Sequence, residues 1–361
     1  MLFAVFLFLV VFSLLVLTHE FGHFIVAKKS GVQVEEFGFG FPPRLFGVKK
    51  GETLYSLNLL PLGGFVRLEG EEDIAGGPRS FAAQSAGKRS FIIVAGVVAN
   101  VITAFMLFSL VHWLGSPIII QDDTPLPAGV RDIVVRVVEV FPHSPAAEHG
   151  LMFGDVIYAF SAKDQRVFIH SMKQVQDFID AHKGEEITVV IKRGKEIENV
   201  LIVPRENPPQ GEGAIGIAML QTGLVSAPWY EALFLGLKTT LVSLGAIVRF
   251  LGTFFLSLFG GSPIDGGIAG PVGIATIVVD TERLGLSYLF QLVALLSVNL
   301  AVLNVLPIPA LDGGRLFFIL IEKIRGAPLA PHIPRIIHSI GFIVLIGLLL
   351  IVTYWDVVRF L

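Results

Sequence analysis

The chain contains no cysteine, so disulfide bonds, thiolate metal sites and a cysteine nucleophile are all excluded. Charge is also scarce: only 16% of the 361 residues are charged, against about 25% in an ordinary soluble domain. Neither sign dominates, and a formal net charge of −3 gives no basis for nucleic-acid binding. Hydrophobic residues instead make up 53% of the chain, so the composition predicts an integral membrane protein.

Long apolar runs define the membrane topology that we expect. The N-terminal run has neither a basic region nor a small-residue cleavage site, so we interpret it as a retained helix and not as a signal peptide. A run at 232–260 carries Lys238 and Arg249 three helical turns apart, which favours a helix lying in the membrane interface. About four transmembrane helices are therefore predicted, at 1–27, 91–115, 285–318 and 336–356.

Basic residues set the predicted orientation. Nine Lys and Arg lie in the loop 28–90, and more follow the third span in the loop 319–335. The positive-inside rule places both loops in the cytoplasm, and both chain ends outside. The run "ETLYSLNLLPLGGFVRL" in the first loop predicts a membrane-associated β-hairpin on the cytoplasmic side.

The segment 120–206 changes character, with short β-rich runs flanking one amphipathic helix at about 171–182. Its stretch "SPAAEHGLMFGDVI" resembles the bacterial PDZ pattern, so we expect an inserted extracytoplasmic PDZ domain of α+β type. A β-domain that serves only as a spacer is the alternative. The post-PDZ region, 207–284, would then contain the interfacial helix.

The motif His19-Glu20-Phe21-Gly22-His23 fits H-E-x-x-H, in which two histidines one turn apart on a helix bind Zn²⁺ and the Glu acts on water. Packed core histidines, or a helix end at the interface, are the alternatives. Neither alternative explains an acid between two histidines within a span, where ionisable groups are costly. The pattern therefore predicts a metal site.

A catalytic zinc site usually needs a third protein ligand. Asp312, in "NVLPIPALDGGRLFF", follows the third span among helix-breaking Pro and Gly residues, although an ordinary Asp-Gly-Gly turn has the same sequence. By the predicted topology, Asp312 reaches the depth of His19 and His23 only if 232–260 does not cross the bilayer.

Together these residues resemble the site-2 protease family of intramembrane zinc metalloproteases, of the RseP type with a single PDZ domain. The resemblance covers nearly the whole chain. It is carried by "HEFGH", "FGFGFPPRLF", "PLGGFVRLEGEE", the PDZ segment, "GPVGI" and "SVNLAVLNVLPIPALDGGRL".

The resemblance implies Zn²⁺ held by His19, His23 and Asp312, with Glu20 as the catalytic acid and base. It also implies that Asn304 and Asn299 help to bind substrate. The expected function is zinc-dependent endoproteolysis within the membrane, acting in regulated intramembrane proteolysis. The expected substrates are single-span membrane proteins, such as anti-sigma factors or signal-peptide remnants. The expected location is the bacterial inner membrane, with the PDZ domain outside and the active site toward the cytoplasm.

The chain departs from the family pattern in its second span. The usual Gly-Pro-x-x-Asn reads Gly96-Val97-Val98-Ala99-Asn100 here, without the proline that would kink the helix. The rival hypothesis is a non-catalytic PDZ scaffold, or a metal-handling protein with a structural zinc site. That hypothesis gives no reason for Glu20 to stand between the two histidines.

Overall fold

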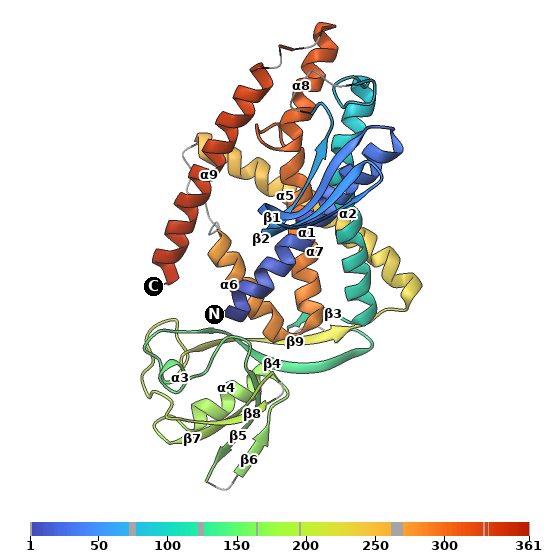
Figure 1. The fold of residues 1–361 in the computed structure, drawn as a ribbon. Helices are drawn as coiled ribbons and strands as arrows, with labels where there is room; N and C mark the ends of the chain where they lie inside the picture. The colour runs from blue at the N-terminus through green and yellow to red at the C-terminus, as the bar shows by residue number, and fades with distance from the viewer. Residues whose placement is uncertain are drawn as a thin grey trace. The chain divides into compact units, whose positions relative to one another are not determined.

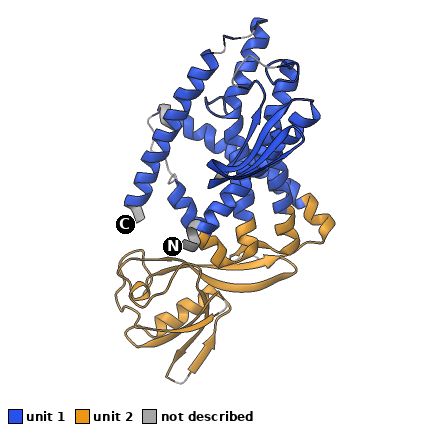
Figure 2. Cartoon of the chain, in the orientation of Figure 1, with its two compact units in different colours: residues 1–108, 235–278, 291–361 blue, residues 109–234, 279–290 orange. Residues whose placement is uncertain are grey.

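The computed structural model describes residues 2–71, 77–121, 126–163, 165–194, 196–260, 270–327, 329–330 and 332–360. Glu72, which ends the "PLGGFVRLEGEE" segment, lies outside this description. The chain divides into two compact units (Figure 2). Unit 1 comprises 1–108, 235–278 and 291–361, and unit 2 comprises 109–234 and 279–290.

Helices and strands follow one another as labelled in Figure 1. The helices are α1 Leu2–Lys29, α2 Ala86–Leu114, α3 Pro145–Glu148, α4 Met172–Ala181, α5 Trp229–Gly260, α6 Pro271–Leu284, α7 Leu286–Val305, α8 Asp312–Arg325 and α9 His332–Phe360. The strands are β1 Val34–Lys50, β2 Thr53–Leu68, β3 Ser116–Ile120, β4 Val130–Val140, β5 Val156–Ala162, β6 Gln165–Phe168, β7 Ile187–Arg193, β8 Glu196–Ile202 and β9 Ile217–Val225.

Five described helices are long and apolar enough to cross a membrane, one more than the sequence suggested. They are α1, α2, α5, α7 and α9, and the additional one is α5, the helix expected to lie at the interface. In the most apolar window of α9 no residue is buried within the protein, and in that of α5 only 6% are. Apolar surface of this extent is unfavourable in water, so these helices indicate a polytopic membrane protein.

α5 and α6 follow unit 2 along the chain, in the region where an interfacial helix was expected. The chain leaves unit 2 within α5, since 235–278 belong to unit 1, and it returns to unit 2 within α6, since 279–290 belong there. The residues just before 235 and those just after 278 thus belong to the same unit. α6 has 14 residues and is not among the five described helices that are long and apolar enough to cross a membrane. The location of 232–260 at the interface therefore stays a prediction, although α5 is long and apolar enough to span.

In unit 1, close packing of α1 against α2 fixes the position of the first helix. A Cβ atom at Gly22 of α1 would lie only 2.8 Å from Cβ of Ala99 in α2, so the two helices approach at a position where glycine is needed. At the end of α1 nearest the hairpin, buried apolar side chains join α1, both strands and α2: Ala27, Val32, Val34, Leu68 and Ile92. The core between α2 and α7 consists of Ala104, Phe108, Ala294, Val298 and Val302.

The β1–β2 hairpin is more elaborate than two simple strands. Residues 37–39 of β1 have neighbours on both sides: Tyr55, Ser56 and Leu57 on one, Val66, Phe65 and Gly64 on the other. The second half of β1 pairs with 53–58 alone. The stretch 64–68 of β2 is consequently an edge, paired with β1 on one side only among the described residues. Ser13 of α1 ties the hairpin to the helix by donating a hydrogen bond of 2.7 Å to the carbonyl of Pro61.

Unit 2 contains a seven-stranded sheet with the order β3-β9-β4-β5-β7-β8, in which β6 pairs with β5. The predicted helix at 171–182 is confirmed as α4, and the short β-rich runs predicted around it correspond to β4, β5, β7 and β8. The sheet extends beyond the expected boundary at 206, because β9 pairs with both β3 and β4. The sequence did not reveal β9, whose partners are distant in the chain.

Candidate active site

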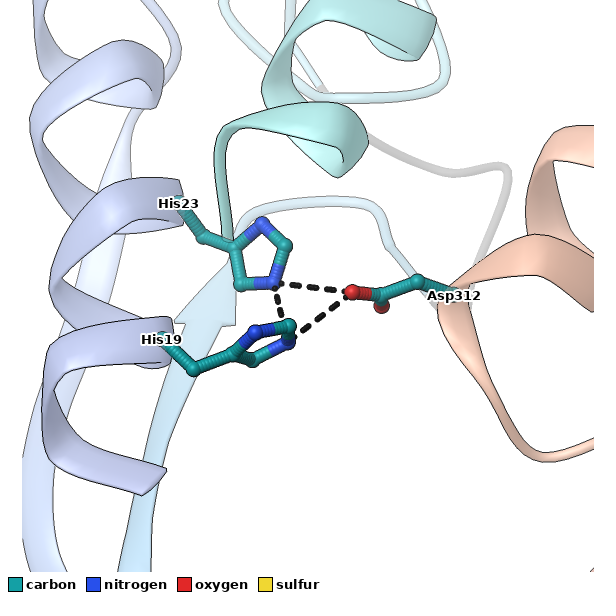
Figure 3. Close-up of side chains that lie close together, drawn as sticks. All are labelled: His19, His23 and Asp312. Atoms are coloured by element: carbon teal, nitrogen blue, oxygen red, sulfur yellow. Dashed lines mark hydrogen bonds and ion pairs between the residues drawn. The ribbon is translucent and has the colours of Figure 1, made fainter. Parts of the chain in front are cut away.

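Three side chains that are far apart in the sequence meet in unit 1 (Figure 3). Nε2 of His19 lies 2.9 Å from Oδ2 of Asp312, and Nε2 of His23 lies 3.2 Å from the same oxygen. The two Nε2 atoms are 3.1 Å apart. His19 is buried, and the side chains of His23 and Asp312 are each only 12% exposed. Two imidazoles and a carboxylate thus direct one atom each to a common point.

Local structure explains why these atoms converge. His19 and His23 are one turn apart on α1, so they share a face of the helix. Asp312 is the first residue of α8, after a loop in which Ala310 has a φ of 75° and donates a backbone hydrogen bond of 2.9 Å to Nδ1 of His338. Gly313 allows the loop to close, because a Cβ atom there would overlap the backbone of 305–306.

The donor set fits a zinc ion. A tetrahedral ion with ligands at about 2.0–2.1 Å requires donor atoms roughly 3.3 Å from one another, close to the three distances observed. A histidine that binds metal through Nε2 usually donates its Nδ1–H to a neighbouring acceptor. His23 satisfies this condition, because its Nδ1 lies 2.8 Å from the carbonyl oxygen of Ile92.

An orphaned atom completes the fit at His19. Nδ2 of Asn100 lies 3.2 Å from Nδ1 of His19, and the fully buried Oδ1 of Asn100 has no hydrogen-bond partner among the described residues. Rotating the amide by 180° exchanges these two atoms. Oδ1 then accepts the Nδ1–H of His19, which leaves the lone pair of Nε2 free for a metal.

Gly96 provides the space that the two imidazoles occupy. A Cβ atom at this position would lie 2.8 Å from Cε1 of His19 and would overlap Nε2 of His23. Gly96 and Asn100 are one turn apart on α2, so they share the face that packs against the histidines. The missing proline does not disturb this arrangement, because α2 is continuous from Ala86 to Leu114.

Glu20 faces the same cavity as the three clustered side chains. The cavity has a volume of about 820 Å³, and its lining includes His19, Glu20, His23 and Asp312 together with residues 64–68 of β2. Oε2 of Glu20 accepts a hydrogen bond of 3.1 Å from the backbone N–H of Val66. A carboxylate therefore lies beside the potential metal ligands and contacts the edge of the hairpin.

The structure separates the two asparagines expected to bind substrate. Asn304 is buried, lines the cavity and places Nδ2 3.4 Å from Nε2 of His19. Asn299 lies on the same helix but is exposed and is not among the described residues that line this cavity. Sequence reasoning gave no role to Asn100 or Gly96, although their Gly-x-x-x-Asn spacing was a signal.

Comparison with known proteins supports the interpretation of this site. The model of peptidase family M50 matches residues 7–348. The chain belongs to peptidase family M50. A relative from Clostridium perfringens, provisionally named a zinc metalloprotease, is 34% identical over 354 residues, covering 97% of each chain. Zinc metalloprotease RasP from Geobacillus kaustophilus is 29% identical, covering 98% of this chain and 97% of its own. Zinc metalloprotease RasP from Oceanobacillus iheyensis is 28% identical, covering 98% of both.

Proposed function

We propose that this M50 protein is a zinc-dependent intramembrane endopeptidase that cleaves transmembrane segments of other membrane proteins. The observation that carries the proposal is the convergence of His19, His23 and Asp312 on one point beside Glu20. The two histidines lie on α1, one of the helices that could span a membrane. Membership of the family and the names of the relatives agree with zinc proteolysis.

His19 and His23 would hold the zinc through Nε2, and Asp312 through Oδ2. When bound there, zinc lowers the pKa of a coordinated water and polarises a carbonyl group. The carboxylate of Glu20 takes the proton from the attacking water and delivers it to the nitrogen of the leaving amine. Asn304 directs its Nδ2 toward the cluster, where it can donate a hydrogen bond to the oxygen of the scissile carbonyl as negative charge develops.

A transmembrane substrate must unwind before it can be cleaved. In lipid its peptide groups are hydrogen-bonded within the helix, and unwinding leaves them without partners. The edge 64–68 of β2 lines the same cavity as the ligand cluster and offers backbone groups to an extended segment. Addition of the substrate as a further strand restores hydrogen bonds at the place where cleavage occurs.

We infer the orientation from the distribution of charge. By the positive-inside rule, the basic loops favour a hairpin on the cytoplasmic side of the inner membrane and a segment 120–206 on the outer side. The segment 120–206 is then an external PDZ domain that binds new C-termini or excludes bulky ectodomains. Substrates whose external part has already been trimmed, such as anti-sigma factors or signal-peptide remnants, suit this arrangement.

The test uses Glu20→Gln in the full chain, purified in detergent with zinc. Wild type is expected to cleave a panel of single-span substrates, and a chelator should abolish this cleavage. Glu20→Gln should keep its zinc and lose at least 99% of the activity, because the proton acceptor is gone. A matched control is Glu35→Gln, which alters another glutamate lining the cavity, on β1. A scaffold with a structural zinc site would show no zinc-dependent cleavage in wild type, and cleavage by Glu20→Gln at the wild-type rate would refute the role of Glu20.

A further inference from the structure

The receiving edge of the hairpin is already occupied by side chains of the protein itself. Val66 directs its N–H to Oε2 of Glu20 at 3.1 Å, and Leu68 directs its N–H to Oε2 of Glu71 at 3.4 Å. Alternate residues of a strand direct their N–H groups to the same side. Both groups thus point away from β1, toward the side on which a further strand would be added.

Glu71 is held in this position by a cation from another element. Its Oε1 accepts a hydrogen bond from Nη1 of Arg315 in α8, and the two groups form an ion pair. The Glu71 side chain is only 16% exposed, and both residues line the cavity that contains the ligand cluster. Arg315 follows Asp312 by one turn of α8, so this contact joins the edge of the hairpin to the helix that carries the third potential ligand.

We propose that Glu71 and Arg315 are positioning residues that cap the receiving edge of β2 in the substrate-free protein. The inference rests on the proposed function, since the segment that replaces the cap is the substrate. A carbonyl oxygen of the extended substrate takes the place of the Glu71 carboxylate on the N–H of Leu68. A second carbonyl, two residues along the substrate, takes the place of the Glu20 carboxylate on the N–H of Val66.

Two consequences follow for the reaction. Backbone N–H groups at a sheet edge require an acceptor when substrate is absent, and the two carboxylates supply it. Substrate addition also releases Glu20 from the backbone of the hairpin, so that its carboxylate becomes free to accept a proton. The hydrogen bond between Val66 and Glu20 thereby couples the docking of substrate on β2 to the availability of Glu20 as the base.

The test measures binding separately from cleavage. The probe is a fluorescein-labelled 22-residue Leu/Ala peptide with two central glycines and flanking lysines, and its Kd is measured by anisotropy in detergent. All proteins carry Glu20→Gln, so that the peptide stays intact. Glu71→Ala is expected to lower the Kd about three- to tenfold, because the peptide no longer competes with an internal charged acceptor. Arg315→Gln should also lower the Kd of the peptide, because the Glu71 carboxylate is then held less firmly on the edge.

Glu69→Ala is the matched control, because it removes a carboxylate from the same turn that bonds Gly77 instead of the edge. Its Kd should stay at the reference value. Hydrogen exchange provides a second readout: Glu71→Ala should speed exchange in 64–68 when the peptide is absent, and saturating peptide should slow it again.

An unchanged or raised Kd in Glu71→Ala, with zinc content intact, would overturn the proposal. If Glu71→Ala does not fold, Arg315→Gln decides between the same outcomes. Failure of the proposed function can be distinguished from failure of this inference, because it appears as an absence of chelator-sensitive cleavage in wild type. The comparison of Kd values between the variants does not depend on the cleavage assay.

Discussion

Replacement of Gly96 by alanine tests whether packing between α1 and α2 positions the potential zinc ligands. The added Cβ atom would lie 2.8 Å from Cε1 of His19, against an ordinary contact distance of 3.4 Å or more. The His19 ring must therefore retreat by about 0.6 Å, and His23, whose Nε2 the new atom would overlap, must move further. Metal–ligand distances in well-formed sites lie within about 0.2 Å of their standard values, so shifts of this size disturb the coordination.

The expected magnitude follows from the cost of overpacking. An extra carbon in a close-packed site costs about 1–3 kcal/mol when the neighbours shift to accommodate it. If this cost falls on the zinc-bound arrangement, zinc binds about 5- to 150-fold more weakly, at about 1.4 kcal/mol for each factor of ten. Alanine favours a helix over glycine by about 1 kcal/mol, so α2 itself should not unfold.

The assay is competition for zinc between the detergent-solubilised protein and a chelating indicator, with circular dichroism to verify helix content. Gly87→Ala provides the matched control, because Gly87 lies on the same helix and its new Cβ would meet no other described element within 4 Å. We expect wild-type zinc affinity for Gly87→Ala and weakened affinity with unchanged helicity for Gly96→Ala. Wild-type affinity in Gly96→Ala would refute the argument that this helix contact sets the histidine positions.

Two further predictions concern groups around the site and the hairpin. Asn100→Ala should weaken zinc binding about 10- to 100-fold, because it removes the acceptor for His19 Nδ1–H. Asn100→Asp keeps an acceptor and should lose less zinc affinity. Equal losses of affinity for the two variants in a zinc titration would contradict this role of Asn100. The bidentate contact of Arg79 with Glu52, at 2.8 Å for both bonds, holds the pKa of that carboxyl below its ordinary value. A lowered folded-state pKa contributes stability above the unfolded value of about 4.3 that is lost as the pH falls through the folded value. The decrease in Tm caused by Arg79→Ala should therefore be larger at pH 7 than at pH 3, and an equal decrease at both would show that the ion pair contributes nothing.

Several features could be predicted from the sequence because they depend on local patterns. Uninterrupted apolar runs located α2, α7 and α9, and the periodicity of 171–182 located α4. The spacing of His19 and His23 placed both on one helical face. Pro and Gly around Asp312 predicted an irregular end to the third span, and the structure brings that residue to the histidines.

Other features could not be predicted because they depend on contacts between distant residues. The pairing of β9 with β4 joins residues more than 70 positions apart, and "IAMLQTGLV" carries no pattern that names its partner. Lys238 and Arg249 suggested an interfacial helix, yet α5 is long and apolar enough to span a membrane. The contacts of Asn100 with His19 and of Glu71 with Arg315 each join separate elements, so no local pattern reveals them.

X-ray absorption at the zinc edge of the zinc-loaded wild-type protein tests the central claim most directly. Our account predicts a single zinc environment with two imidazole nitrogens at about 2.0–2.1 Å and the remaining ligands oxygen, one of them from Asp312. A spectrum that contains fewer than two imidazoles would contradict it, because His19 and His23 would then not hold the metal together.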